Sequence, residues 1–99
     1  MDWVSLPLTV LKFGGSSVAD PERMRHVATI VKKVRDEGNR VAVVVSAMGN
    51  MTDDLLALAG DVANTQNGRE MDQLLATGEQ QSVALLALAL QQLGLRAQS

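Results

Sequence analysis

The sequence predicts an α/β fold with a mostly parallel sheet, and three observations support that prediction. A strand-like segment, a glycine turn, a helix-like segment and a second strand-like segment follow one another within the first half of the chain. The second of these strands, residues 41–45 (VAVVV), is an unbroken apolar run, which is typical of a parallel strand covered on both faces. The core is expected to be aliphatic, because only 2% of the residues are aromatic, namely Trp3 and Phe13.

The two predicted strands belong to one strand–helix–strand unit. Residues 6–13 form the first strand, in which Pro7 is tolerated because it lies near the beginning. Residues 41–45 form the second strand. A connection of this kind is expected to be right-handed and to leave the two strands parallel.

The segment between the two strands carries the signals of a helix. Asp20 is placed to cap the N-terminus, Pro21 occupies the first helical position and Glu22 adds an acid to the first turn. Gly38 and Asn39 end the helix. Apolar residues at three- and four-residue steps predict one buried face, made of Met24, Val27, Ile30, Val31 and Val34.

Two further helices are predicted in the second half of the chain. Thr52 begins the first of these helices. Residues 64–68 (NTQNG) connect it to a long second helix over residues 69–93. The second helix is expected to be weakened or interrupted at residues 77–79. Gly94 is placed to cap that helix. The inner face of the first helix is predicted to consist of Leu55, Leu56, Ala59 and Val62. The aligned apolar residues of the second are Met71, Leu74, Leu75, Leu86, Ala89 and Leu93.

Composition excludes several classes of partner. The formal net charge of -2 gives no broad basic field for nucleic acid or an anionic membrane. The chain has no cysteine, so it has neither disulfides nor thiolate metal sites, and its single histidine, His26, is expected on the surface. Residues 1–8 lack the features of a targeting signal, and residues 82–93 are too short and too glutamine-rich to span a bilayer. We therefore expect one small soluble domain in the cytoplasm, with no metal site of its own.

The glycine turn after the first strand is a candidate anion site. Lys12 precedes Gly14 and Gly15, and paired glycines permit positive φ and a close approach of the backbone to a ligand. Backbone N–H groups in such a turn, together with a lysine and a following helix start, can hold a phosphate. The spacing matches neither the P-loop nor GxGxxG, and a tight turn beside a solvated lysine is an equally good interpretation.

Polar residues from two other segments are expected near this turn. Ser46, Gly49 and Thr52 follow the second strand, and ligands of open α/β sheets bind outside the carboxyl ends of the strands. Thr52 is also a candidate helix N-cap. Glu79 lies within an otherwise apolar helix, where it could pair with a cation such as a substrate ammonium; an exposed glutamate at a helix kink is the alternative.

Taken in order, these segments resemble the amino-terminal part of aspartokinases, members of the amino acid kinase family. The resemblance is carried by residues 12–18 (KFGGSSV), 44–49 (VVSAMG), 69–72 (REMD) and 75–80 (LATGEQ). It extends from about Thr9 to the end of the chain. Ser16 stands where that family more often has threonine, a change that keeps the hydroxyl.

The resemblance implies roles for the residues of the glycine turn. Lys12 would lie against the transferring phosphoryl group and offset its developing charge. Gly14 and Gly15 would offer backbone donors to the phosphates of ATP, and Ser17 would support the turn. ATP would enter with Mg²⁺, and such catalysis consists mainly of positioning and charge stabilisation.

The resemblance also implies a second substrate. Ser46, Thr52 and Glu79 match positions that contact L-aspartate, and Glu79 would receive its α-ammonium. The reaction would be ATP-dependent phosphorylation of the aspartate side-chain carboxylate to 4-phospho-L-aspartate, the first step of lysine, threonine and methionine biosynthesis. Another amino acid kinase, such as glutamate 5-kinase or acetylglutamate kinase, is the nearest alternative.

The resemblance finally implies an incomplete three-layer αβα sandwich. Residues 95–99 begin to alternate like a third strand, and residues 1–99 correspond to the amino-terminal portion of an amino acid kinase domain. The later segment that holds the adenine and ribose, and the ACT regulatory domains, have no counterpart here. The isolated chain is therefore expected to lack turnover. It could instead act as a non-catalytic folding or association module, as a homo-oligomer or together with the remainder of the domain.

Overall fold

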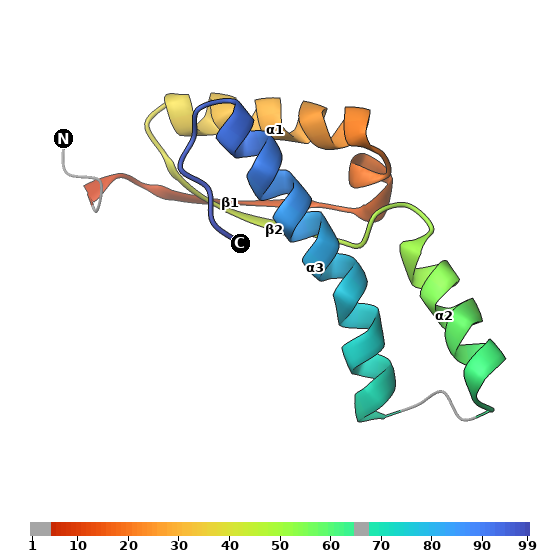
Figure 1. The fold of residues 1–99 in the computed structure, drawn as a ribbon. Coiled ribbons are helices and arrows are strands. Elements are labelled where there is room, and N and C mark those ends of the chain that lie inside the picture. The colour runs from red at the N-terminus through yellow and green to blue at the C-terminus, as the bar shows by residue number, and fades with distance from the viewer. Residues whose placement is uncertain (1–4, 65–67) are drawn as a thin grey trace.

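The computed structural model describes residues 5–64 and 68–99. The elements in chain order are β1 (Leu8–Phe13), the 3₁₀ helix η2 (Gly15–Val18), α1 (Pro21–Asp36), β2 (Arg40–Val45), α2 (Met51–Val62) and α3 (Arg69–Gln92). β1 and β2 pair in parallel, with Leu8 opposite Arg40 and Phe13 opposite Val45, and α1 connects them (Figure 1). The α/β class with a parallel sheet is confirmed.

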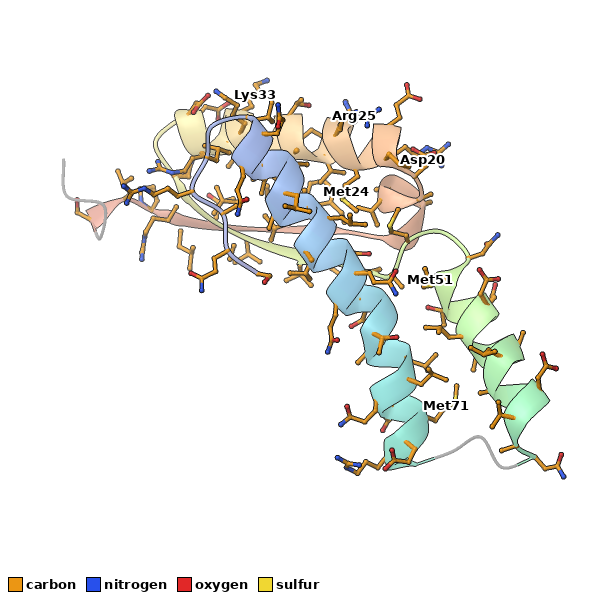
Figure 2. All side chains as sticks on the ribbon, in the orientation of Figure 1. Asp20, Met24, Arg25, Lys33, Met51 and Met71 are labelled. Atoms are coloured by element: carbon orange, nitrogen blue, oxygen red, sulfur yellow. The ribbon has the colours of Figure 1, made fainter. Side chains whose placement is uncertain are left out.

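The helix α1 begins and ends as the sequence predicts. The Asp20 carboxylate accepts a hydrogen bond from the Arg23 backbone N–H at 2.8 Å, and Pro21 is the first helical residue. Gly38 ends the helix with φ +98°, a conformation that favours glycine. Met24 points from α1 toward the sheet in Figure 2. The buried residues of α1 are Met24, Val27, Ala28 and Val31, while Ile30 is exposed.

The hydrophobic core lies between α1, α3 and one face of the sheet. Figure 1 shows α3 crossing over the strands beside α1. Half-buried residues of both strands, including Leu11, Phe13 and Val43, pack against this core. The core cluster consists of Val18, Met24, Val27, Ala28, Val31, Val45, Leu86 and Leu90. Within residues 5–64 and 68–99, the buried members of this cluster are all aliphatic, and Phe13 packs against them.

The opposite face of the sheet is open among the described residues. The side chains of Leu8, Val10 and Val44 are exposed there, Val10 at 62%. The prediction that residues 41–45 are covered on both faces is therefore wrong, because α1 and α3 both pack on the same face. A run of β-branched residues reports strand propensity, whereas the number of covered faces depends on where the helices lie.

The helices α2 and α3 form a hairpin that extends away from the sheet (Figure 1). The Cα radius of gyration is 15.9 Å, compared with roughly 13 Å for a compact chain of this length. Met51, Leu55 and Ala59 are half-buried on the side of α2 that faces α3, while Val62 is 81% exposed. The predicted inner face is therefore wrong for Val62 and for Leu56, which is also exposed. Residues 65–67 of the predicted connector lie outside the described residues.

The helix α3 runs continuously for 24 residues, so the interruption that the sequence allowed at residues 77–79 does not occur. Gly94 ends it as expected, with φ +89°. The Gly94 N–H donates to the Gln91 carbonyl at 2.9 Å and the Leu95 N–H donates to the Leu90 carbonyl at 3.1 Å. This pair of bonds is a Schellman motif. Within the described part of the chain, no helix is long and apolar enough to cross a membrane.

The predicted third strand over residues 95–99 does not form. Leu95 and Ala97 are half-buried against the core, and the Gln91 side-chain amide donates to the Ala97 carbonyl at 2.9 Å. The segment is thus tied to α3 rather than to β2, although its burial alternates like that of a strand. A groove of about 1120 Å³ is lined by β2, by α3 and by residues 94–98.

Candidate functional site

The candidate site is built where the two parallel strands end. The strand pairing places Lys12 opposite Val44 and Phe13 opposite Val45. One residue further along, the Ser46 backbone N–H donates to the Phe13 carbonyl at 3.1 Å. Ser46 therefore lies directly beside the beginning of the glycine turn, and the segments after β1 and β2 share one edge of the sheet.

The two glycines of the turn have different structural roles. Gly14 has φ -78°, and Gly15 is not among the positive-φ glycines, so neither residue uses the positive φ that glycine permits. A Cβ added at Gly14 would meet nothing within 4 Å. A Cβ added at Gly15 would lie 2.9 Å from the Ala47 carbonyl oxygen, closer than real Cβ contacts. Gly15 is therefore required by the close approach of another backbone segment.

The glycine turn itself closes into the 3₁₀ helix η2, which the sequence did not predict. The Ser17 N–H donates to the Gly14 carbonyl at 3.1 Å, and the fully buried Val18 anchors the end of η2 in the core. The Arg23 guanidinium donates to the Ser16 carbonyl at 3.3 Å and supports the turn from α1. The burial of Val18 and the hydrogen bond from Arg23 thus fix the position of the turn.

A backbone hydrogen bond joins this turn to the loop after β2. The Gly49 N–H donates to the Gly15 carbonyl at 3.1 Å. Gly49 has φ +48° and also lies close to Ala19, so a side chain here would be strained. The bond holds the two loops together at the carboxyl ends of the strands.

The middle of α3 forms the third wall of the site. A Cβ added at Gly78 would lie 3.0 Å from Cγ of Met51, 3.1 Å from Cβ of Ala47 and 3.5 Å from Cδ1 of Leu55. The absence of a side chain at Gly78 thus lets α3 approach both the loop after β2 and the start of α2. Glu79 is the next residue along α3.

The predicted site residues differ in exposure. Lys12 is exposed, on the face of β1 that α1 and α3 leave open, and Ser17, Thr52 and Glu79 are also exposed. Ser46 is half-buried. Thr52 is the second residue of α2, so it is not the N-cap; that position belongs to Asn50, which makes no side-chain capping bond. The Thr52 hydroxyl is therefore not used as the cap of this helix.

The arrangement suits an anionic ligand. Lys12 supplies a positive charge, and the first backbone N–H groups of a helical turn have no partner inside that turn. The N-terminus of α2 also lies beside the loop after β2, but Asp53 and Asp54 in its first turn offset the partial positive charge of the helix end. Among residues 5–64 and 68–99, no cluster of three or more His, Cys, Asp or Glu side chains could hold a metal ion.

Comparison with known proteins agrees with this geometry. Residues 7–99 match the model of the amino acid kinase family. This chain belongs to the amino acid kinase family. It is 53% identical over 94 residues to an aspartokinase from Mycolicibacterium smegmatis, and 52% identical over 92 residues to one from Geobacillus stearothermophilus. These matches cover 95% and 93% of this chain, and 22% and 23% of the two relatives.

A solved structure supports the same assignment. The crystal structure of aspartate kinase from Synechocystis superposes with a TM-score of 0.84 at 52% sequence identity, covering 87% of this chain and 15% of that chain. The resemblance to the amino-terminal part of aspartokinases and the α/β fold class are thereby confirmed. This amino acid kinase chain spans about a fifth of the length of its curated relatives.

Two residues that organise the site in this amino acid kinase chain are not predicted from the sequence. Ala47 is buried between Gly15 and Gly78, and Arg23 supports the glycine turn. The small residues of the loop (SAMG) were a usable signal for Ala47, since close backbone approaches favour small side chains. Arg23 carried no comparable signal, because its contact depends on how α1 packs beside η2. His26 is exposed, as expected.

The glycine contacts lead to a prediction about Gly15→Ala. We expect this variant to lower the free energy of unfolding by about 1–3 kcal/mol, because its methyl group would displace the Ala47 carbonyl. Urea unfolding followed by circular dichroism measures this loss. Gly14→Ala is the matched control, and its stability is expected to stay within about 1 kcal/mol of the parent because the space is open. Equal losses in the two variants would contradict the prediction.

Proposed function

We propose that this chain supplies the amino-terminal part of an aspartate kinase active site. The reaction transfers the γ-phosphoryl group of ATP to the side-chain carboxylate of L-aspartate. One observation carries the proposal. The hydrogen bond from the Gly49 N–H to the Gly15 carbonyl holds the glycine turn beside the loop after β2, at the carboxyl ends of the parallel strands. Ligands of open α/β sheets bind at such an edge.

The glycine turn is assigned to the phosphates of ATP. Lys12 offsets the charge that spreads over the transferring phosphoryl group. Gly14 and Gly15 offer backbone N–H donors, and Ser17 supports the turn through its N–H bond to Gly14. The open space around Gly14 leaves room for a phosphate oxygen to come close to the backbone. Mg²⁺ would enter with ATP and bridge its phosphates.

The loop after β2 and the middle of α3 are assigned to L-aspartate. Ser46 offers a hydroxyl group just after β2, and Thr52 offers one in the first turn of α2. Glu79 provides the negative charge for the α-ammonium group. A side-chain carboxylate oxygen attacks the γ-phosphorus, the bond from that phosphorus to the bridging oxygen breaks, and ADP leaves with that oxygen. The product is 4-phospho-L-aspartate.

A second candidate function is supported by the open face of the sheet. Leu8, Val10 and Val44 form an exposed apolar surface there, which is characteristic of a contact with other polypeptide. Under this alternative the chain folds or associates without turnover. The two candidates differ in whether the isolated chain binds small ligands.

An amide NMR titration of the 99-residue chain separates the two candidates. With Mg-ATP, we expect saturable shifts at Gly14 and Gly15. With L-aspartate, we expect them at Ser46, Thr52 and Glu79. L-glutamate is the matched control ligand, because it tests the glutamate 5-kinase alternative with one added methylene. A folded spectrum that responds to none of these ligands would contradict binding by this chain and favour the non-catalytic alternative.

A further inference from the structure

We propose that Ala47 and Gly78 form a positioning contact that places Glu79 relative to the loops at the ends of β1 and β2. The proposal rests on the proposed function, which assigns Glu79 to the α-ammonium group of L-aspartate. Neither residue touches substrate in this assignment. Their effect on the substrate acts through the position of α3.

The contact is tight on both sides of Ala47. Its carbonyl oxygen lies 2.9 Å from where a Cβ of Gly15 would be, and its own Cβ lies 3.1 Å from where a Cβ of Gly78 would be. Ala47 is buried, as is Gly78. One alanine is thus enclosed between two glycines that belong to two different segments. A larger side chain at any of the three positions requires one segment to move away.

The helix α3 transmits such a movement to Glu79. The helix is continuous through Gly78, and farther along Leu86 and Leu90 anchor it in the core. A helix without a break has little freedom to absorb a local push by kinking. A methyl group at Gly78 therefore shifts the surrounding part of the helix, including Glu79. On the other side, Cγ of Met51 lies 3.0 Å from the added Cβ, so α2 leaves little room for the methyl group.

The Ala47–Gly78 pair allows a test in which a methyl group is moved across the contact. Gly78→Ala adds the methyl group, and Ala47→Gly combined with Gly78→Ala transfers it from the loop to the helix at constant volume. Gly60→Ala is the matched control, because Gly60 is also inside a helix but exposed. Affinities of the 99-residue chain for L-aspartate and for Mg-ATP are measured by NMR titration, and stability is measured by urea unfolding.

We expect Gly78→Ala to weaken L-aspartate binding by about tenfold, the loss typical of one misaligned charge-assisted hydrogen bond. Mg-ATP affinity is expected to change less than about twofold, since Glu79 is not assigned to the nucleotide. The double variant is expected to recover most of the aspartate affinity, because Ala47→Gly removes the methyl group that the added Cβ would meet, and residues in contact are energetically coupled. Gly60→Ala is expected to leave both affinities unchanged.

Three outcomes would overturn the proposal in distinguishable ways. Unchanged aspartate affinity in Gly78→Ala would remove the positioning role and leave the proposed function intact. Parallel losses of both affinities and of stability would show a merely structural contact. Absence of aspartate binding by the parent chain would contradict the proposed function itself, and the inference with it. If Gly78→Ala fails to fold, the single variant Ala47→Gly is used instead, because it loosens the same contact. Weaker L-aspartate binding by Ala47→Gly would then support the positioning role, and unchanged binding would overturn it.

Discussion

Replacing Lys12 by glutamine is expected to lower the rate of phosphoryl transfer by about 10²–10³-fold, the usual cost of removing one group that stabilises transition-state charge. The assay uses a chimera in which this chain replaces the matching 22% of the Mycolicibacterium smegmatis aspartokinase. ADP release from ATP in the presence of L-aspartate measures the rate. The side chain of Lys12 is exposed on the open face of β1, so the substitution removes no packing of the core.

Lys33→Gln is the matched control for this experiment. It makes the same change of charge on an exposed lysine, and Figure 2 shows Lys33 pointing away from the sheet, near the end of α1. We expect turnover by that variant to stay within about twofold of the parent chimera, because solvent and salt screen exposed charges over such a separation. Equal rates in the two variants would remove Lys12 from its assigned role. An inactive parent chimera would instead contradict the aspartate kinase proposal.

Leu86→Ala is expected to lower the free energy of unfolding by about 2–5 kcal/mol, because it removes a buried side chain and leaves a cavity. Leu86 is 4% exposed and belongs to the cluster that joins α3 to α1 and the sheet. The stability of a natural domain is about 5–15 kcal/mol, so this loss is a large part of the total. Urea unfolding followed by circular dichroism measures it.

The control for this substitution lies two residues away on the same helix. Leu88 is 61% exposed, so Leu88→Ala removes the same atoms without opening a cavity. Its loss is expected to stay within about 0.5 kcal/mol. Similar losses for the two variants would mean that the core between α3 and the sheet does not carry the stability. A higher midpoint for Leu86→Ala than for the parent would contradict the packing directly.

The fold could be predicted from sequence wherever the signal is local. Asp20, Pro21 and Gly38 define the ends of α1 through capping and backbone conformation, and all three are confirmed. Gly94 ends α3 for the same reason. The predictions that are wrong concern features that depend on packing against another segment of the chain. Val62 fits an amphipathic helix but is exposed, because packing on α3 sets which side of α2 is buried.

The candidate site shows the same division. The order Lys12, Gly14 and Gly15 after an apolar strand predicted a glycine turn, and the turn forms. Which glycine is sterically required could not be predicted, because the constraint at Gly15 comes from Ala47, a residue 32 positions along the chain. The contact of Gly78 with that same loop could not be predicted either, because a glycine within a helical pattern indicates only a lower helix propensity.

The sequence by itself determined the parallel strand–helix–strand unit and the family, because strand runs, helix caps and the residues around Lys12 are each encoded within a few neighbouring positions. The tertiary structure decided which face of the sheet is covered, the orientation of α2 and the meeting of Gly15, Ala47 and Gly78. The physical reason is that these features arise from excluded volume and burial between segments far apart in the chain. Such contacts exist only once α1, α3 and the strands have packed together.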